Sequence, residues 1–436
     1  MKKITIALTT AALLSNMAFA DDTTDIAELK KMMSEFQANQ EALIDETSNA
    51  QVGFTTVDTA FSHNGMGAAA SKVYNSSSPL SIGGYGDMYF ASSDKGGSDN
   101  LSDVYHFVPY IGYKFTDNII LNTEIEFEHG GSNAEAAAAG NSDAAEGYAI
   151  IEFMYLDFLI SQSFNIQLGH LLVPMGMINL RHEPTLYNTI QKPLTEKYII
   201  PATWHATGVN TYGKIGDTGL TYNAGITQAL ELNNADNGTK GQVRDGRPGV
   251  TGKTLFNRAA FVGRLDYRGV TGLMMGASLY YGDASQGTVA DATALIYDLH
   301  ATYEFSGLKI KALYGATSIS NAENIASNTA GTPAQSITDS NGYYMNLEYD
   351  LFATFATPQK LPLFVQYDYI DPAATVVDPL GNTIAKDVSK TATTTIGVNY
   401  FPHEQVVLKA DYAMTDFKAA GATDYNTISL GLGFIF

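Results

Sequence analysis

The chain ends in the stretch Tyr425-Asn426-Thr427-Ile428-Ser429-Leu430-Gly431-Leu432-Gly433-Phe434-Ile435-Phe436. From Ile428 to Phe436 every second residue is large and apolar, and most residues between them are small or polar. Because side chains alternate across a strand, this pattern predicts a β-strand with one apolar face. Such a face turns either toward a dry core or toward lipid, and a lipid-facing terminal strand would pair with the first strand of a closed barrel. This stretch alone leaves both interpretations open.

The composition favours one large β structure that is partly exposed to lipid. The 436 residues include 40 glycines, 26 tyrosines, 21 phenylalanines and no cysteine. Only 16% of the residues are charged, well below the quarter that is usual in soluble domains. A mean hydropathy of −0.06 fits strands in which lipid-facing and wet residues alternate, because the two kinds of residue average out.

The amino-terminus has the pattern of a secretory signal peptide over residues 1–20. Lys2 and Lys3 precede an apolar run over residues 4–14, and Ala18-Phe19-Ala20 supplies small residues at the cleavage positions. The apolar run is too short for a transmembrane helix, which needs about 20 residues. We therefore expect export, with the mature chain beginning at Asp21. Without cysteine, the exported chain has neither a lipoprotein anchor nor disulfides.

The charge balance argues against nucleic acid as a partner. Once Lys2 and Lys3 are removed with the signal peptide, 23 basic residues face 45 acidic ones. Nucleic acids and anionic surfaces bind basic patches, so neither is an expected partner. The simplest interpretation places the acidic excess on solvated loops.

Residues 21–48 have the spacing of a coiled-coil helix, and residues 49–79, which lack periodicity and are rich in Ser, Thr, Ala and Gly, follow as a linker. Apolar residues recur at intervals of three and four over about three heptads, with Gln40 in the same seam. An isolated helix of this length is marginal in water, so we expect self-association, as a homotrimer, in the periplasm. The alternative is a single amphipathic helix folded onto its own domain. The proposed trimer seam consists of Ile26, Leu29, Met33, Phe36 and Leu43.

Residues 80–436 contain about 16 strand candidates whose connections alternate between short and long. The short connections carry turn residues, as in Thr116-Asp117-Asn118 and Ser306-Gly307, and the long ones are polar and rich in Gly, Ala and Asn. This alternation is typical of an outer-membrane barrel, in which every second turn faces the periplasm. Aromatic residues close the strands just before the short turns, as in an interfacial girdle: Phe115, Phe158, Tyr267, Phe305, Phe352 or Phe355, Phe401 and Phe436. The predicted fold class is all-β, a transmembrane antiparallel β-barrel. Soluble propellers and β-helices also repeat strands, but they do not predict this girdle.

The predicted interior is wet. On several strands charged residues alternate with apolar ones, and burying each such charge in a dry core would cost several kcal/mol. Residues 148–160 and 204–215 alternate poorly, so the pattern does not assign their faces.

Three segments resemble a family of bacterial porins. They are Ser81-Ile82-Gly83-Gly84-Tyr85-Gly86-Asp87, Gln167-Leu168-Gly169-His170-Leu171-Leu172-Val173-Pro174-Met175-Gly176, and His182-Glu183-Pro184 with Tyr198-Ile199-Ile200-Pro201-Ala202-Thr203-Trp204. The chain resembles the superfamily of the phosphate-selective porins O and P. The resemblance implies a trimeric sixteen-stranded outer-membrane channel, with residues 174–203 folded inward as a constriction loop. Phosphate selectivity is not implied, because those porins line the pore with basic residues and this chain is acidic. Phe434 and the terminal Phe436 resemble the signal that barrel-assembly machinery recognises.

The candidate site residues are charged groups expected on the inner wall and on the loop. In a ring of sixteen strands, the third strand stands opposite the eleventh, so acidic and basic groups would face each other across the lumen. The alternative is that these groups are wet lining without a part in selection. The pore-lining candidates are Glu124, Glu126 and Glu128 on the third strand, Arg258, Arg264 and Arg268 on the eighth, and Lys309 and Lys311 on the eleventh.

The constriction loop supplies the second set of candidates, which either filter solute or pin the loop to the wall. Because a loop inside a lumen must satisfy its own backbone, we expect Glu183, Pro184 and Trp204 to be structural. The loop candidates are Arg181, His182, Glu183, Lys192, Glu196 and Lys197.

The predicted function is passive diffusion of small hydrophilic, charged solutes through an outer-membrane porin of a Gram-negative bacterium. The alternative is a substrate-specific channel or receptor, for example for anion or siderophore uptake. A barrel enzyme is disfavoured because neither a Gly-x-Ser-x-Gly turn nor a His-Glu-x-x-His helix occurs in the sequence. No cofactor and no metal are expected. The expected partners are outer-membrane lipid, the barrel-assembly machinery, further copies of the chain and small hydrophilic solutes.

Overall fold

The computed structural model describes Lys31, Ser34 and residues 56–97, 99–131, 147–233, 239–248, 254–327, 334–384, 390–418 and 422–436. The predicted signal peptide and the seam of the predicted coiled coil lie outside these residues, so both remain predictions. Within these ranges, no helix combines the length and the apolar character needed to cross a bilayer.

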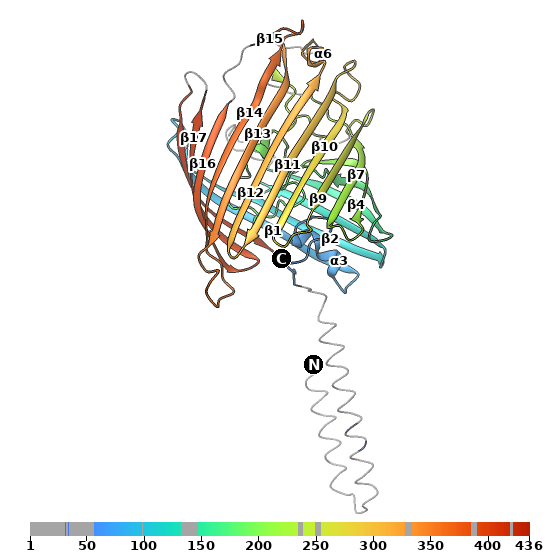
Figure 1. Ribbon diagram of the computed structural model, residues 1–436, viewed down its shortest axis with the longest axis vertical. Helices are drawn as coiled ribbons and strands as arrows, with labels where there is room; N and C mark the ends of the chain where they lie inside the picture. Colours follow the sequence, from blue (N-terminus) through green and yellow to red (C-terminus); the bar gives the residue numbers. More distant parts are fainter. Residues whose placement is uncertain are drawn as a thin grey trace, which may run out of the picture. The chain divides into compact units, whose positions relative to one another are not determined.

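Sixteen antiparallel strands form a closed barrel wall, as the sequence predicts (Figure 1). The sheet has two further strands of two residues each, β8 (Thr239–Lys240) and β15 (Thr383–Ile384), which lie in the connections between wall strands. The wall strands are β1 (Leu80–Ser93), β2 (Leu101–Thr116), β3 (Ile119–Glu128), β4 (Tyr148–Leu159), β5 (Asn165–Leu172), β6 (His205–Ile215), β7 (Leu220–Gln228), β9 (Ala259–Tyr267), β10 (Leu273–Asp283), β11 (Thr293–Phe305), β12 (Leu308–Ser320), β13 (Gln335–Asp350), β14 (Pro362–Val377), β16 (Thr391–His403), β17 (Val406–Phe417) and β18 (Tyr425–Ile435).

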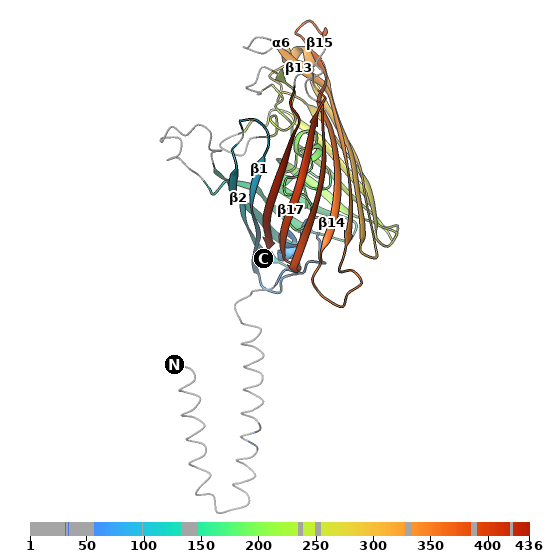
Figure 2. The ribbon, with the colours of Figure 1, turned by 90° about the vertical axis from the view of Figure 1, so that its left-hand side faces the viewer.

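The terminal stretch closes the barrel. β18 pairs with β1 in antiparallel register from Tyr85↔Ile435 to Ser93↔Thr427. The backbones of Gly84 and Phe436 extend this pairing, each N–H donating to the other residue's carbonyl at 2.9 Å. In Figure 2 the first and last strands run side by side, the blue β1 next to the red end of the chain. Closure leaves no wall strand with an open edge, which is the condition for spanning hydrocarbon with strands.

The alternation of side chains gives the wall an apolar outside. On β18, Ile428 and Leu430 point outward with 53% and 54% of their surface exposed, whereas Ser429 is buried. On β11, Leu299 is 58% exposed and its neighbours Asp298 and His300 are buried inside. An outer surface of this kind is stable against lipid but not against water, so the barrel is transmembrane.

Short and long connections alternate around the barrel, which confirms the predicted pattern. Six short turns fall where the sequence places them, including residues 117–118 between β2 and β3 and 306–307 between β11 and β12. The connection between β13 and β14, residues 351–361, is longer than the predicted turn at 357–359. At the short-turn end Phe115, Phe305 and Phe355 are 57%, 65% and 65% exposed, as the girdle requires.

A β-bulge explains why residues 148–160 alternate poorly. Glu124 on β3 pairs with Phe153, but the next residue, Ile125, pairs with Ile151. Glu152 is therefore the extra residue of a bulge on β4. As a result Glu152 and Phe153, although consecutive, are both fully buried in the interior.

Residues 56–79, predicted as part of a linker, instead fold against the inside of the barrel. They contain the helix α3 (Ala68–Asn75), whose residues 68–73 are buried. α3 packs on β1, β2 and β3, where Gly112 leaves room for Val73: a Cβ at Gly112 would lie 2.4 Å from that side chain. The small residues Ala68, Ala69 and Ala70 let the helix approach the wall closely, and a segment that is rich in small residues and lacks periodicity resembles a linker.

The interior is largely filled, because two apolar clusters pack between the wall and segments inside the barrel. The larger cluster joins Trp204, Ile199 and Ile200 of the connection between β5 and β6 to wall residues such as Tyr280 and Ile296. The smaller one joins α3 to Tyr85 and Phe153. Two further helices among residues 56–436, as far as these are described, are short: α5 (Thr195–Tyr198) lies within the β5–β6 connection, and α6 (Ala322–Ser327) lies between β12 and β13.

Candidate functional site: a lumen narrowed by an inward loop

The connection between β5 and β6, residues 173–204, runs inside the barrel and is called the constriction loop below. Its green ribbon lies behind the strands of the wall in Figure 2. Its two ends are held together at a neck. The Val173 N–H donates to the Trp204 carbonyl at 2.9 Å. The Asn179 side chain donates to both the Val173 and Trp204 carbonyls and accepts from the Trp204 N–H. The loop is thus a closed structural unit.

The middle of the loop is fastened to β12, β13 and β17. Lys409 on β17 donates to the carbonyls of Tyr187 and Thr189 at 2.7 and 3.1 Å. Lys311 on β12 donates to the Leu186 carbonyl at 2.9 Å. Asn188 donates to Glu348 on β13 at 2.7 Å. These contacts satisfy backbone groups that would otherwise be buried without partners.

Glu196 fastens the loop to itself and to the wall. It is fully buried and accepts hydrogen bonds from the backbone N–H groups of Met177 and Ile178, at 2.8 and 2.6 Å, and from the Tyr344 hydroxyl at 2.6 Å. Burial raises the pKa of Glu196 to about 7, although the hydrogen bonds from Tyr344 and Ile178 act in the opposite direction. These contacts support the second of the two predicted roles for the loop candidates, in which they pin the loop to the wall.

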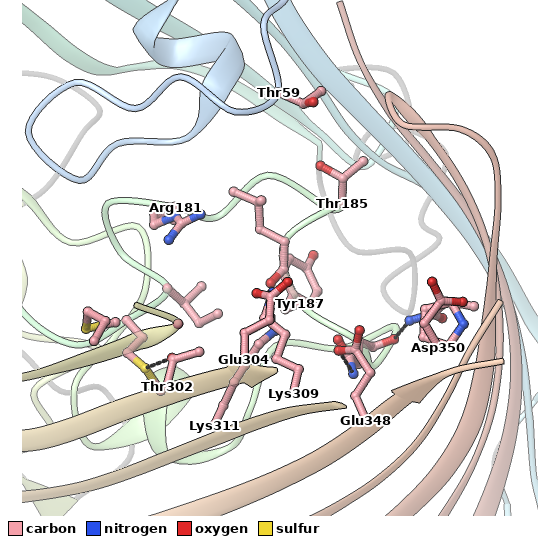
Figure 3. Close-up of a pocket in the computed structure, with 18 of the residues that line it drawn as sticks. Thr59, Arg181, Thr185, Tyr187, Thr302, Glu304, Lys309, Lys311, Glu348 and Asp350 are labelled. Atoms are coloured by element: carbon pink, nitrogen blue, oxygen red, sulfur yellow. Dashed lines mark hydrogen bonds and ion pairs between the residues drawn. The ribbon is translucent and has the colours of Figure 1, made fainter. Parts of the chain in front are cut away.

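A cavity of about 930 Å³ opens between the loop and the short-turn end of the barrel. Figure 3 shows Lys309, Lys311 and Glu304 pointing into it from the wall, with Arg181 and Tyr187 of the loop opposite. The charged lining residues are the cations Arg181, Arg264, Arg268, Lys309, Lys311 and Lys360, and the acids Glu304, Glu348, Asp350 and Glu404. Cations outnumber acids on this lining.

A second cavity of about 410 Å³ lies on the other side of the loop, toward the long connections. Lys192 and Lys197 of the loop line it, facing Asp368, Asp411 and a row of threonines on β16 and β17. Gln366 on β14 lines both cavities. Next to it on β14, Asp368 accepts a hydrogen bond from the Leu194 N–H of the loop at 3.0 Å.

The structure brings together most of the predicted basic residues. Arg264, Arg268, Lys309 and Lys311 line the larger cavity together with Arg181 of the loop. As the sequence predicts, Arg264 lies on the eighth wall strand, β9, and Lys309 and Lys311 lie on the eleventh, β12. Arg264 is also held in place, donating to Asp266 at 2.9 Å and to the carbonyl of Gly176.

The acidic residues of the third strand do not face open water, which corrects the predicted arrangement. Glu124 and Glu126 point inward from β3 but are 0% and 1% exposed. Glu124 lies 2.9 Å from His182 of the constriction loop, and Glu128, which is partly exposed, lies 3.3 Å from His106 on β2. The loop covers this side of the lumen. The acidic groups of β3 therefore do not face the basic groups of β12 across an open passage, contrary to the prediction from the sequence.

Arg258 was predicted on the inner face of the eighth strand, and the structure places it outside that strand. β9 begins at Ala259, and Gln286 accepts hydrogen bonds from the backbone N–H groups of Asn257 and Arg258. The Arg258 side chain is 59% exposed and lines neither cavity. The Arg258 carbonyl still accepts from the Ala229 N–H at 3.1 Å, but its N–H donates to Gln286 of the β10–β11 connection, and the regular strand begins at the next residue.

The other predicted residues lie in three places. Glu183 of the loop accepts from the backbone N–H groups of Ala69 and Ala70, at 3.0 and 3.1 Å, and so joins the loop to α3. Burial raises the pKa of Glu183 and lowers the pKa of Lys197 to about 8. Phe434 and Phe436 lie at the end of β18, where Phe436 is 37% exposed. The proposed seam residues Ile26, Leu29, Met33, Phe36 and Leu43 are outside the described residues.

Sequence reasoning missed Asn188, Gln366, Lys360 and Glu404 in the cavities and Glu152 beneath the loop. Asn188 and Gln366 are neutral, and charge was the signal used. Glu152 sits on the bulge, so the poor alternation of residues 148–160 was itself a signal of an irregular strand.

Comparisons with known proteins agree with this geometry. A closed sixteen-stranded barrel with a loop folded into its lumen is a porin-like fold. Among solved structures, the OmpF of Salmonella typhi in complex with daunomycin matches with a TM-score of 0.51 at 12% identity, over 82% of this chain and 97% of that one. The anion-selective porin from Comamonas acidovorans matches with a TM-score of 0.50 at 13% identity, over 82% of this chain and 99% of that one. At these identities the likeness concerns the fold alone.

An uncharacterized protein of Aquifex aeolicus (strain VF5) is 30% identical to the chain over 362 residues, which are 81% of this chain and 80% of that protein. The chain belongs to the same family as this Aquifex protein. No protein-family profile matches it.

Proposed function

We infer that the protein is an outer-membrane porin, a passive diffusion channel for small hydrophilic and charged solutes. The observation that carries this function is the larger cavity, which is lined by ten charged side chains and bounded by a loop that narrows the lumen. Porins need a sized, charged passage and no catalyst. The apolar outside of the barrel supports a place in the outer membrane of a Gram-negative bacterium, with the short turns facing the periplasm.

The proposed assembly is a homotrimer whose amino-terminal coiled coil lies in the periplasm. The heptad spacing of residues 26–43 supports it. The proposal includes a signal peptide over residues 1–20 and recognition of Phe434 and Phe436 by the barrel-assembly machinery. We also propose a distant relation to the superfamily of the phosphate-selective porins O and P, without their selectivity.

Planar-bilayer recording of the purified protein tests the function. A porin produces discrete conductance steps whose ion preference can be measured under a salt gradient. The absence of steps from protein that is folded, by its reduced mobility in unheated gel samples, would contradict the proposal.

A substrate-specific channel is the second candidate, and the filling of the barrel favours it. The constriction loop is bonded to several wall strands, α3 occupies part of the short-turn end, and the two cavities have Gln366 as their one common lining residue. A narrow passage with fixed polar groups selects solutes by fit. Saturation of ion current by one solute class, at low single-channel conductance, would support this candidate over general diffusion.

A further inference from the structure

Beneath the constriction loop, three buried side chains from three different segments converge. Glu124 comes from β3, Glu152 from the bulge of β4, and His182 from the loop. They are 0%, 0% and 3% exposed. His182 Nε2 lies 2.9 Å from Glu124 Oε1 and 3.3 Å from Glu152 Oε2. One donor atom from each of the three residues lies within 4.8 Å of the other two.

The hydrogen bonding of this triad is incomplete among the described residues. Neither oxygen of Glu152 accepts a hydrogen bond, nor does Glu124 Oε2. A buried carboxylate oxygen without a donor is costly, and this site contains three such oxygens. All three belong to side chains that are fully buried and point at the triad, so the site has free ligand atoms for a further partner.

The orientation of His182 is that of a metal ligand. Its Nδ1 lies 2.8 Å from the Asn179 carbonyl, which can only accept, so Nδ1 carries a proton. In the neutral ring this leaves the Nε2 lone pair directed at two carboxylates. A histidine whose second nitrogen donates to a backbone carbonyl is the usual arrangement around a bound metal, because that hydrogen bond fixes the tautomer and the ring.

A charge of −2 at the triad is neutralised by two protons or by one divalent cation. Two carboxylates and one neutral imidazole carry a charge of −2, and protonating His182 would lower this only to −1. A divalent cation would neutralise both carboxylates and would give the free oxygens a ligand. The mixture of one imidazole and two carboxylates suits Zn²⁺, Mn²⁺ or Fe²⁺ better than the softer metals that prefer sulfur.

A neighbouring group repeats the design. His106 Nδ1 lies 2.7 Å from Asp87, and its Nε2 faces Glu126 and Glu128 at 3.7 and 3.3 Å. His106 Nε2 and Glu126 Oε1 have no hydrogen-bond partner in the described part of the chain. In both groups, therefore, the Nε2 atom of a histidine lies close to the carboxylates of two glutamates.

We propose that Glu124, Glu152 and His182 form a binding site for a first-row divalent metal ion that fastens the constriction loop to the barrel wall. His182 is the only one of the three that belongs to the loop, so the ion would connect the loop covalently, through coordination bonds, to β3 and β4. This role is structural and is independent of which solute passes through the channel.

The test is Zn²⁺ binding by the full-length protein refolded into detergent in the presence of EDTA and then freed of chelator. Zn²⁺ bound per chain is measured by mass spectrometry after gel filtration for the wild type and for Glu152→Gln. Glu196→Gln is the matched control: it is also a fully buried glutamate, but both of its oxygens accept hydrogen bonds from the protein. We expect Glu152→Gln to bind one equivalent fewer than the wild type, and Glu196→Gln to match the wild type.

A second measurement uses the wild type alone, so it does not depend on the folding of a variant. Because the ion binds the folded state, saturating Zn²⁺ should raise the thermal midpoint of the barrel by about 5 °C. Equal Zn²⁺ content in the wild type and Glu152→Gln, or a midpoint that Zn²⁺ leaves unchanged, would overturn the metal site and assign the triad to a protonated His182. A channel that conducts normally but binds no Zn²⁺ would overturn this inference and leave the proposed function intact.

Discussion

At the scale of single residues, the constriction loop depends on a contact that one added methyl group would break. Gly176 has φ +68°, a conformation that residues with a Cβ rarely adopt. A Cβ at this position would lie 2.4 Å from Glu196 Oε2, the oxygen that accepts from Met177 and Ile178. Glycine is thus required at this position for two reasons: its backbone has a positive φ, and a Cβ would collide with Glu196.

Gly176→Ala tests this contact. We expect it to destabilise the folded barrel by roughly 1–3 kcal/mol, from backbone strain and displacement of Glu196, measured as the loss of heat-modifiable mobility with temperature. Gly381→Ala is the control, because Gly381 has a similar φ of +79° but open space around it. An equal loss in both variants would mean that strain, and not the Glu196 contact, accounts for the effect.

Glu196 also predicts a pH dependence. Its pKa is raised from 4.5 to about 7, so the folded state favours the protonated form. Its stabilising contribution is fully present below about pH 4.5 and is lost as the pH rises through 7, a change on the order of 3 kcal/mol. Tyr344 and Asp298 face the same carboxyl, and Tyr344 donates to it in either form.

Thermal midpoints of the wild type and Glu196→Gln between pH 4.5 and 8 measure this change. Glutamine imitates the protonated acid, so the difference between the two proteins should be small at pH 4.5 and should grow in favour of the variant up to pH 8. Other titrating groups are present in both proteins, so their effects on the thermal midpoint cancel when the two midpoints are subtracted. A difference that is constant with pH would contradict the raised pKa.

At the scale of elements, paired glycines on the inner wall make room for the loop. Gly315 on β12 and Gly342 on β13 are directly opposite each other in the ladder. A Cβ on Gly315 would lie 2.5 Å from Ile200, and one on Gly342 would lie 2.9 Å from Thr195, both residues of the loop. The wall strands therefore determine how closely the loop can approach.

Gly315→Val should push the loop away from β12 and widen the passage. We expect a larger single-channel conductance, because side-chain atoms of the loop have no space beside a valine at this position. Ala312→Val, on the outward face of the same strand, adds similar volume toward lipid and should leave the conductance unchanged. Unaltered conductance in Gly315→Val, with the barrel folded, would mean that the loop position does not limit the current.

At the scale of the whole barrel, the charge of the lumen differs from the charge of the chain. The formal net charge is −20, yet the larger cavity has six cationic and four acidic side chains. Much of the acidity is placed elsewhere: Glu124, Glu126 and Glu152 are buried beneath the loop, Asp94 is exposed in the β1–β2 connection, and Asp416 lies near the end of β17. Net charge is therefore a poor guide to selectivity here.

Replacing Lys309 and Arg268 together by glutamine should shift the ion preference toward cations. Each removed charge is worth about 0.5–1 kcal/mol at a few ångströms in water, so removing two charges should change the permeability ratio roughly five- to thirty-fold. The reversal potential under a salt gradient measures the ratio. Arg258→Gln is the matched control, because this arginine lines neither cavity. An equal shift in the control would show that surface charge, and not the cavity, sets the preference.

The sequence by itself determined the barrel: the alternation on β11, β13 and β18, the order of short and long connections and the strand numbers of Lys309 and Arg264 all follow from local, period-two patterns. The inward loop was indicated by resemblance. Only the tertiary structure decided that residues 56–79 pack inside the barrel, that Glu152 turns inward at a bulge and that Glu124 is buried under His182. The physical reason is that the period-two pattern of a strand predicts on which face of the wall a side chain lies, but not which other segment packs on that face. The segments that pack there are distant in the chain, and their contacts with the wall produce no periodic pattern in the sequence.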